Sequence, residues 1–207
     1  DLFVAFRDRP NALFRNDGGV FRDEAPALGL ADPRRTVGAV WFDADEDGDL
    51  DVAVANMDGD ANGLFRNDGT RFVDVAAEAG VAWGGRAPKD PGRGSVRVCA
   101  ADLDTDGRFD LVAANYGPLG FFSNRGGGQF ADRAGTVTGG VSWQDSLLKN
   151  TGTTFVDQTP AVVRRLQADH GVQWADVDGD GDLDLALTGS RADGMHLVLR
   201  NDLAAAD

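Results

Sequence analysis

The chain has 207 residues, 42% of them hydrophobic, and 28 glycines, so it can bury a sizeable core while turning often. Its formal net charge of −14 argues against a nucleic-acid-binding protein, which normally carries a basic face. No apolar run approaches the roughly 18 to 20 residues of a membrane-spanning helix, so no direct membrane span is expected. The single cysteine, Cys99, cannot form an internal disulfide and leaves the redox compartment undecided.

Three Asp-rich loops recur along the chain, each between two short apolar runs. In chain order they read DADEDGDLD at residues 43–51, DLDTDGRFD at 102–110 and DVDGDGDLD at 176–184. A second signature, LFRNDG or a variant of it, follows each loop, and most copies continue into an aromatic residue and an acid. Short apolar runs bounded by turn residues are typical of strands. The repeating unit is therefore four short strands, with the Asp-rich loop between the first and the second.

This unit matches one blade of a β-propeller, because a period of about 50 to 60 residues accommodates four antiparallel strands. We therefore predict an all-β fold and treat residues 1–207 as a single, incomplete β-propeller domain of about five blades. An open fan of blades would expose the core faces of its end blades, so further blades or a partner chain must cover them, and we favour further blades. The predicted blade segments are residues 1–30, 37–81, 96–137, 139–163 and 170–202.

Two further loops are represented only by remnants, Asp1 and Asp145. The N-terminal stretch aligns with the sequence from Asp51 onward, which puts Asp1 on the last aspartate of a loop. Asp145 lies only 5 residues before the signature Asn150, whereas the intact repeats take 22 to 25 residues over the same interval. We predict a break near 145–146, with about 17 to 20 residues missing; an ordinary Cα separation of about 3.8 Å there would instead indicate a naturally shortened blade.

The loop sequence D-x-D-x-D-G-x-x-D suits Ca²⁺. If the loop curls, the carboxylates at positions 1, 3 and 5 converge, and the glycine at position 6 permits the positive φ that the curl requires. Position 7 then offers its backbone oxygen and position 9 a further carboxylate, which gives a flexible all-oxygen site that favours Ca²⁺ over Mg²⁺. Three Ca²⁺ ions are expected, and they would change the formal charge from −14 to −8. The predicted ligands are Asp43, Asp45, Asp47, Asp49 and Asp51, then Asp102, Asp104, Asp106, Arg108 and Asp110, then Asp176, Asp178, Asp180, Asp182 and Asp184, with Asp49, Arg108 and Asp182 acting through the backbone oxygen.

Other kinds of site fit the loops less well. An EF-hand needs a glutamate at position 12 between two helices, but position 12 is Val54, Ala113 or Leu187 within a strand-like run. Zn²⁺ is disfavoured because the two histidines and the cysteine do not form a ligand-spaced cluster. The remaining alternative is a solvated Asp/Gly turn without metal, and three copies in register argue against it.

The stretch FDADEDGDLDVAVAN, followed by LFRNDGTRFVDVAAEAGV, resembles the VCBS or FG-GAP repeats of integrin α-subunits and bacterial secreted proteins. The run LFRNDG-x-x-F-x-D-x-A-x-x-x-G-[VL], at residues 13–30 and 64–81, is most similar to the cartilage acidic protein and UnbV group. The resemblance implies a seven-bladed propeller with Ca²⁺ between the first and second strands of a blade, held by the loop aspartates. Arg108 at position 7 departs from the other two loops, and we expect it to weaken the second site.

Three features outside the loops have more than one interpretation. The segment WGGRAPKDPGRGS carries Arg86, Lys89 and Arg93, and it is either a solvated insertion, our default, or a loop that contacts a partner. The arginines of the LFRN signature are interpreted as polar ties or as parts of a solvated face. Trp41, Trp143 and Trp174 share one register before a loop, and we expect them to pack in the fold rather than to stack on a ligand.

Catalysis has little support, because the chain lacks a Gly-x-Ser-x-Gly elbow, a Cys/His arrangement and a phosphate-binding loop. We predict a non-enzymatic, Ca²⁺-binding adhesion or scaffolding module that docks on a protein partner or a larger assembly. Weak Ca²⁺ sites fill only in Ca²⁺-rich surroundings, so a secreted, periplasmic or cell-surface location is expected. The alternative is a carbohydrate-binding or lyase-like propeller with its active site outside the given residues, and a third interpretation is a subunit tethered to a membrane complex.

Overall fold

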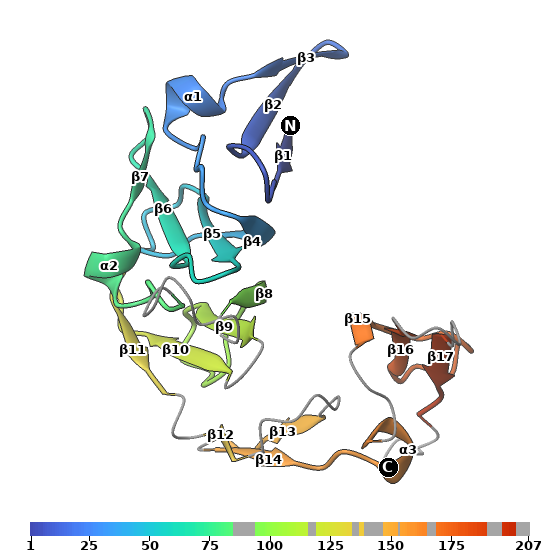
Figure 1. The fold of residues 1–207 in the computed structure, drawn as a ribbon. Helices are drawn as coiled ribbons and strands as arrows, with labels where there is room; N and C mark the ends of the chain where they lie inside the picture. Colours follow the sequence, from blue (N-terminus) through green and yellow to red (C-terminus); the bar gives the residue numbers. More distant parts are fainter. Residues whose placement is uncertain are drawn as a thin grey trace. The chain divides into compact units, whose positions relative to one another are not determined.

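The computed structural model describes residues 1–84, 94–115, 119–133, 137–138, 147–152, 154–164, 169–189 and 196–201 (Figure 1). These residues form short antiparallel sheets accompanied by helices of about one turn each. The chain divides into two compact units, one of residues 1–141 and 150–155, the other of residues 142–149 and 156–207. The prediction of an all-β fold made of antiparallel propeller blades is confirmed.

Two sheets of the first unit have the full four strands. One comprises β4 (Thr36–Phe42), β5 (Asp51–Asn56), β6 (Gly63–Asn67) and β7 (Phe72–Asp74), in that order. The other comprises β8 (Ser95–Ala101), β9 (Asp110–Asn115), β10 (Gly120–Asn124) and β11 (Phe130–Asp132), again in chain order. Each strand pairs with the next one along the chain, so the Asp-rich loops connect the first strand of each sheet to the second, as the repeat predicts.

Three further sheets have three strands each within the described ranges. β1 (Leu2–Val4), β2 (Ala12–Asp17) and β3 (Val20–Asp23) align with the second to fourth strands of a blade. β15 (Asp169–Ala175), β16 (Asp184–Gly189) and β17 (His196–Leu199) align with the first three, and the third Asp-rich loop joins β15 to β16. The remaining sheet has the order β12 (Val137–Thr138), β14 (Phe155–Asp157), β13 (Leu148–Asn150). The break predicted near 145–146 lies outside the described residues, and the blade boundaries stay a prediction.

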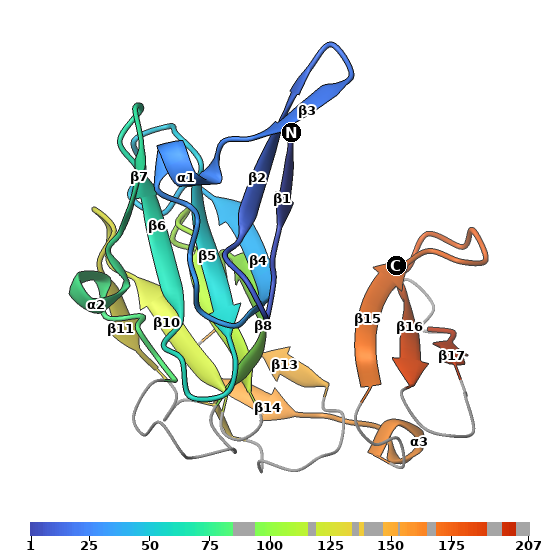
Figure 2. The ribbon, with the colours of Figure 1, turned by 45° about the horizontal axis from the view of Figure 1, so that its top comes forward.

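Strand β5 is buried along its whole length because a sheet packs on each of its faces. Val52 belongs to an apolar cluster that includes Leu13 of β2, whereas the next residue, Ala53, belongs to a cluster that includes Leu111 of β9. Successive side chains of a strand point to opposite faces, so this alternation places the β4–β7 sheet between the two other sheets of the first unit. Figure 2 shows these three sheets stacked face against face.

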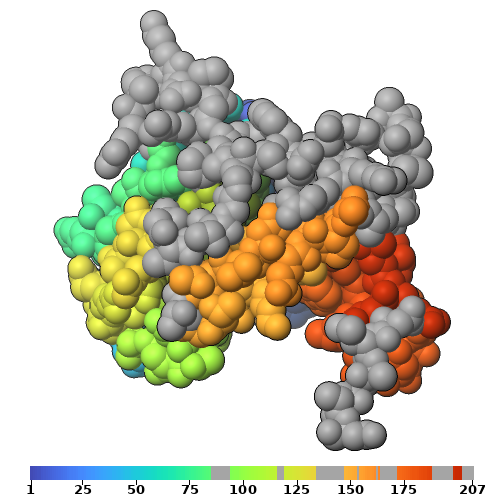
Figure 3. Space-filling model, turned by 90° about the horizontal axis from the view of Figure 1, so that it is seen from below, coloured from blue at the N-terminus to red at the C-terminus, as the bar shows by residue number. Residues whose placement is uncertain are grey.

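Short helices follow the fourth strand of several sheets, and sequence reasoning did not predict them: α1 (Ala25–Leu28), α2 (Ala76–Ala79) and α3 (Ala161–Arg164). At α2, Asp74 Oδ1 accepts the N–H of Ala76 at 3.0 Å, and Gly80 ends the helix with a φ of 82°. A Cβ on Gly80 would lie 3.0 Å from the backbone oxygen of Phe130, because α2 packs directly on β11 (Figure 3). The signature F-x-D-x-A-x-x-x-G therefore encodes a capped helical turn.

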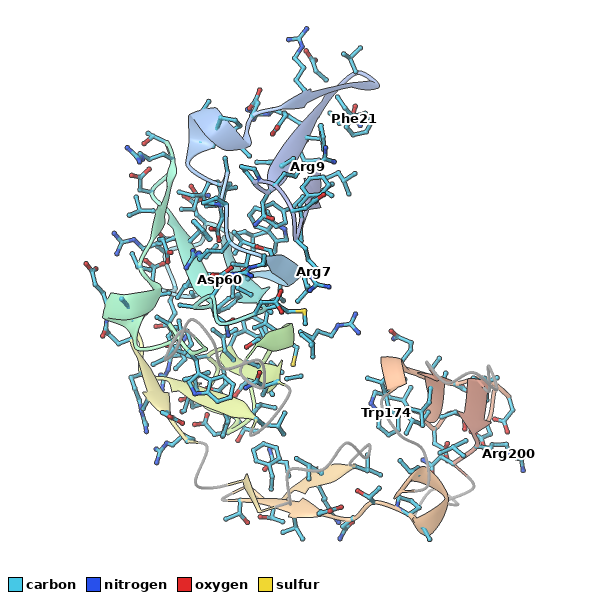
Figure 4. All side chains as sticks on the ribbon, viewed as in Figure 1. Arg7, Arg9, Phe21, Asp60, Trp174 and Arg200 are labelled. Carbon is cyan, nitrogen blue, oxygen red and sulfur yellow. The ribbon has the colours of Figure 1, made fainter. Side chains whose placement is uncertain are left out.

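The tryptophan of the first intact repeat packs between strands. Trp41 meets Phe3 and Phe72 edge-on, with ring centroids 5.9 Å and 5.8 Å apart, so the predicted packing role is confirmed for this residue. Trp174 lies in β15 with 44% of its surface exposed (Figure 4). Trp143 lies outside the described residues.

Candidate metal centres

Each Asp-rich loop brings together the carboxylates of positions 1, 3 and 9. One oxygen from each of these three residues lies within 4.8 Å of the other two. The position-5 aspartates, Asp47, Asp106 and Asp180, are not members of these groups; each accepts the backbone N–H of the residue two positions later, at 2.9 to 3.1 Å. The three groups are Asp43, Asp45 and Asp51; Asp102, Asp104 and Asp110; and Asp176, Asp178 and Asp184.

The curl of each loop is held between position 1 and position 6. In the first loop, Asp43 Oδ2 accepts the N–H of Gly48 at 3.0 Å, and Gly48 has a φ of 92°. The second and third loops repeat this bond at 3.0 Å and 3.1 Å, with glycine φ values of 90° and 93°. Because glycine adopts such angles at no steric cost, the predicted positive φ at position 6 is confirmed in every copy.

Position 9 anchors the loop from the start of the second strand. Asp51 has no exposed surface; its Oδ2 accepts the N–H of Ala44 at 2.8 Å and its Oδ1 accepts the N–H of Asn67 at 2.7 Å. Position 9 thus joins the loop to the third strand through bonds that involve no ion. The counterparts Asp110 and Asp184 are equally buried and accept the corresponding N–H groups, from Leu103 and Asn124 and from Val177 and Asn201, at 2.8 to 3.0 Å.

The remnant Asp1 makes one contact of this kind. The N–H of Asn16, the signature asparagine of the first LFRN, donates to Asp1 Oδ1 at 2.9 Å. No carboxylate group of the described residues includes Asp1. The other remnant, Asp145, and the basic residues Arg86, Lys89 and Arg93 lie outside the described residues, so their predicted roles stay predictions.

Sequence reasoning missed the signature asparagine as part of the loop structure. Its N–H binds the position-9 aspartate in all three intact repeats, across 16, 14 and 17 residues of sequence. The available signal was the regular recurrence of asparagine at the end of LFRN or its variants. A residue that recurs at a steady offset from the loop lies at the same place on the third strand, which pairs with the second strand where position 9 lies. The recurring asparagine was therefore a candidate hydrogen-bond partner of the position-9 aspartate.

Burial disfavours the ionised form of several loop aspartates. It raises the pKa of Asp45, and the negative charge of Asp47 raises this pKa further. Burial also raises the pKa values of Asp51 and Asp110, although their two backbone N–H bonds oppose the shift. Asp184 differs, because its hydrogen bonds to the N–H groups of strand and loop lower its pKa more than burial raises it. A bound cation would favour the charged form of every one of these carboxylates.

Two oxygens in the loops lack a bonding partner. Asp45 Oδ1 and Asp182 Oδ1 are buried, and neither has a hydrogen-bond partner among the described residues. Buried polar atoms are normally hydrogen-bonded, and an ionised carboxylate can only accept. A hard cation would supply the contact that Asp45 Oδ1, a member of the first carboxylate group, lacks. An all-oxygen set suits Ca²⁺ or Mg²⁺ rather than Zn²⁺. The residues present therefore fit a metal site.

The residue before the signature asparagine lies beside position 3 of the loop. Arg200, the residue after β17 (labelled in Figure 4), pairs with Asp178 at 3.2 Å between Nη1 and Oδ2. In the second loop the hydroxyl of Ser123 donates to Asp104 Oδ2 at 3.2 Å. In the first loop the charge of Arg66 opposes the rise in the pKa of the position-3 aspartate. Arg200 thus forms a polar tie to its loop while its side chain stays largely exposed.

Arg108 distinguishes the second loop from the other two. Its Nη2 forms an ion pair with Asp106, and its Nε donates to the backbone oxygen of Asn124 at 3.3 Å. A guanidinium therefore already neutralises one of the predicted ligands of this loop. The expectation of a weaker second site stays a prediction, and this ion pair supports it.

The repeat pattern places the chain in a known family. The sequence profile of the FG-GAP-like repeat matches residues 1–54 and again residues 43–113, just over half of the chain, including the first two Asp-rich loops. The chain belongs to the FG-GAP-like repeat family. This FG-GAP-like chain is also similar to cartilage acidic protein 1 of Mus musculus, with 30% identity over 131 residues. The predicted resemblance is thus confirmed.

The match to cartilage acidic protein 1 covers 60% of this chain but only 19% of that protein. The FG-GAP-like chain therefore spans about a fifth of the length of this curated relative. Within the described ranges, none of the helices has the length and apolar character needed to cross a membrane.

Proposed function

We propose that this FG-GAP-like chain is a non-enzymatic Ca²⁺-binding propeller module, in which each of the three intact Asp-rich loops holds one Ca²⁺ ion. The buried, unpartnered Oδ1 of Asp45, within a three-carboxylate group that recurs in the other loops, carries this proposal. The carboxylates of positions 1, 3 and 9 form the core of each site. Position 5 would join them by a change of side-chain rotamer, and position 7 would contribute its backbone oxygen.

The ion would act structurally. Three carboxylates whose oxygens lie within 4.8 Å of one another repel when all are ionised. This repulsion destabilises the folded loop when no ion is bound. Ca²⁺ replaces this repulsion with attraction and thereby stabilises the connection between the first two strands of each blade. Extracellular Ca²⁺ modules bind with dissociation constants of about 10⁻⁴ to 10⁻³ M, which supports a secreted, periplasmic or cell-surface location.

The stiffened blades would dock on a protein partner or a larger assembly, as an adhesion or scaffolding module. The membership in the FG-GAP-like family and the similarity to a protein named for cartilage support an extracellular setting. The segment with Arg86, Lys89 and Arg93, a solvated insertion by default, is the candidate contact loop if a partner binds there, because it places three cations in a chain of net charge −14. For the carbohydrate-binding alternative the described tryptophans differ, since Trp41 packs against Phe3 and Phe72 whereas Trp174 is 44% exposed.

Thermal unfolding and calorimetry test the Ca²⁺ proposal. Unfolding is followed in EDTA, in CaCl₂ and in MgCl₂, and Ca²⁺ binding to the full chain is titrated by calorimetry. We expect a higher midpoint in Ca²⁺ than in EDTA, a smaller effect of Mg²⁺, and three binding sites. The matched control carries Asp45→Asn, Asp104→Asn and Asp178→Asn, and it should lose the Ca²⁺ effect. Equal midpoints in EDTA and CaCl₂ together with no binding heat would overturn the proposal.

A further inference from the structure

The peptide group at position 2 of the first loop joins two neighbouring sheets. The N–H of Ala44 donates to Asp51 Oδ2 at 2.8 Å, and the carbonyl oxygen of the same residue accepts from Asn124 Nδ2 at 3.0 Å. Asn124 ends β10 in the adjacent sheet and has no exposed surface. One residue of the loop therefore contacts both its own position-9 carboxylate and the next blade.

The second loop repeats this connection. The N–H of Leu103 donates to Asp110 Oδ2 at 3.0 Å, and the carbonyl oxygen of Leu103 accepts from Asn150 Nδ2. Asn150 is the signature asparagine at the end of β13. In two successive loops, therefore, the position-2 carbonyl oxygen accepts a hydrogen bond from the signature asparagine of the next sheet along the chain.

Asn124 also closes the link between the two loops. While its side chain donates to Ala44 of the first loop, its backbone N–H donates to Asp110 Oδ1 of the second loop at 2.8 Å. Its Nδ2 has a second acceptor in the backbone oxygen of Phe109, at 3.2 Å. An unbroken hydrogen-bonded path therefore runs from Asp51 through Ala44 and Asn124 to Asp110.

The two ends of this path, Asp51 and Asp110, belong to two different carboxylate groups. An ion that holds Asp51 fixes the Ala44 peptide, and this peptide is the acceptor that orients the Asn124 side chain. When the Asn124 side chain is fixed, the backbone N–H of Asn124, which donates to Asp110 Oδ1, is held in place as well. Because part of the ordering of the second loop is then already complete, that loop loses less conformational entropy when the second ion binds.

We propose that Asn124 is a positioning residue that couples the first and second Asp-rich loops, so that Ca²⁺ in one loop raises the affinity of the other. This inference rests on the proposed Ca²⁺ function. Coupling of this kind is reciprocal, so each loop must change the affinity of the other by the same factor. Typical couplings between sites correspond to about 5-fold to 150-fold in affinity.

The test uses the full chain with the third loop silenced by Asp176→Asn and Asp178→Asn. The first loop is silenced by Asp43→Asn with Asp45→Asn, or the second by Asp102→Asn with Asp104→Asn, and Ca²⁺ affinities are measured by calorimetry. We expect that silencing the first loop weakens the second by about 5-fold or more, and that the reverse experiment gives the same factor.

The role of Asn124 is tested with Asn124→Ser, which should bring this factor close to one. Asn67→Ser is the matched control. Asn67 is the signature asparagine of its own blade, but the described acceptor of its side chain, the Leu50 oxygen at 3.4 Å, lies in the same sheet's loop. The factor between the first two loops should survive Asn67→Ser, whatever that substitution does to stability.

The outcomes separate this inference from the Ca²⁺ proposal. If both loops bind Ca²⁺ but silencing one leaves the other's affinity unchanged, the coupling is wrong and the proposed function stands. A factor that survives Asn124→Ser would overturn the role of Asn124. If neither loop binds Ca²⁺, the proposed function itself fails. Should Asn124→Ser not fold, the reciprocal silencing experiment on the chain with native Asn124 still decides whether the loops are coupled.

Discussion

Asn11 and Thr36 are joined by a buried hydrogen bond of 2.8 Å, from Asn11 Nδ2 to Thr36 Oγ1, that crosses from one sheet to the next. The hydroxyl of Thr36 in turn donates to Asn56 Oδ1 at 2.7 Å, which extends the hydrogen-bonded chain to a third residue. The next pair of sheets repeats the arrangement, with Asn62 Nδ2 donating to Ser95 Oγ at 2.8 Å. These contacts lie at the start of the first strand of a blade, at the end opposite its Asp-rich loop, so neighbouring blades are tied at both ends.

Substituting Thr36→Val should destabilise the chain by about 1 to 3 kcal/mol, because it leaves the buried amide of Asn11 and the buried oxygen of Asn56 without their partner. Urea unfolding measures the change. Thr70→Val is the control: it removes an exposed hydroxyl whose bond, within the described part of the chain, is to nearby Asp68, and it should cost clearly less. Equal costs for the two substitutions would mean that the bond between sheets contributes little.

The position-9 aspartate should matter for folding even without an ion. In EDTA, Asp51→Asn is expected to cost about 1 to 3 kcal/mol, because an amide NH₂ would face one of the two N–H groups that the carboxylate now accepts. Asp47→Asn is the matched control, since Asp47 is exposed and, among the described residues, accepts only the N–H of Asp49 at 2.9 Å. Chemical unfolding in EDTA distinguishes them, and a larger loss for Asp47→Asn would contradict the anchoring role of position 9.

Arg108→Asp should strengthen the second site. The substitution releases Asp106 from its ion pair and replaces a positive charge beside the site with a negative one, as in the other two loops. We expect the Ca²⁺ affinity of the second loop to rise by roughly 10-fold, the effect of about 1.4 kcal/mol of charge interaction near a protein surface. Calorimetry measures this on the chain with the first and third loops silenced. Arg22→Asp makes the same charge change on an exposed strand of another sheet, and it should leave the affinity within about 2-fold.

Gly29 ends α1 with a φ of 84° and lies against the next sheet, where an added Cβ would be 2.5 Å from the backbone oxygen of Phe72. Gly29→Ala therefore combines a left-handed backbone with a steric clash, and it should cost at least about 2 kcal/mol. Gly69→Ala is the control, because Gly69 has a similar φ of 81° but its nearest neighbour is a carboxylate oxygen 3.8 Å away. Unfolding free energies that agree for the two variants would show that close packing at Gly29 is unimportant.

The sequence was sufficient to predict the blade and the loop but not the contacts between blades. The strand order and the positive φ of Gly48 follow from local patterns, because alternation and turn residues act within a few positions of sequence. The bond from Asn124 to Ala44 could not be predicted in this way, since it spans 80 residues and depends on how two sheets stack. The ion pair of Arg108 was missed for a different reason: a position valued for its backbone oxygen also has a side chain, which here reaches Asp106.

The ion-free chain should become more stable on mild acidification. Burial raises the folded-state pKa values of Asp45, Asp51 and Asp110, so the folded chain binds protons more readily than the unfolded chain. The contribution of these three groups to the free energy of unfolding decreases as the pH rises through their folded pKa values. It is regained as the pH falls toward the ordinary carboxyl pKa of about 3.9. The unfolding midpoint in EDTA should therefore rise as the pH falls from 7 through the folded pKa values of these three groups toward about 3.9.

Protonation has the opposite effect on Ca²⁺ binding, because the ligands must be ionised. The gain in midpoint caused by Ca²⁺ should consequently shrink over the same pH range. Asp45→Asn removes one titrating group and should flatten the pH dependence in EDTA. Groups whose folded pKa is lowered, such as Asp60 beside Arg35, lose their contribution only at lower pH and do not mask the trend. A midpoint in EDTA that drops steadily as the pH falls from 7 toward about 4 would show that repulsion among the loop carboxylates does not limit the stability of the ion-free chain.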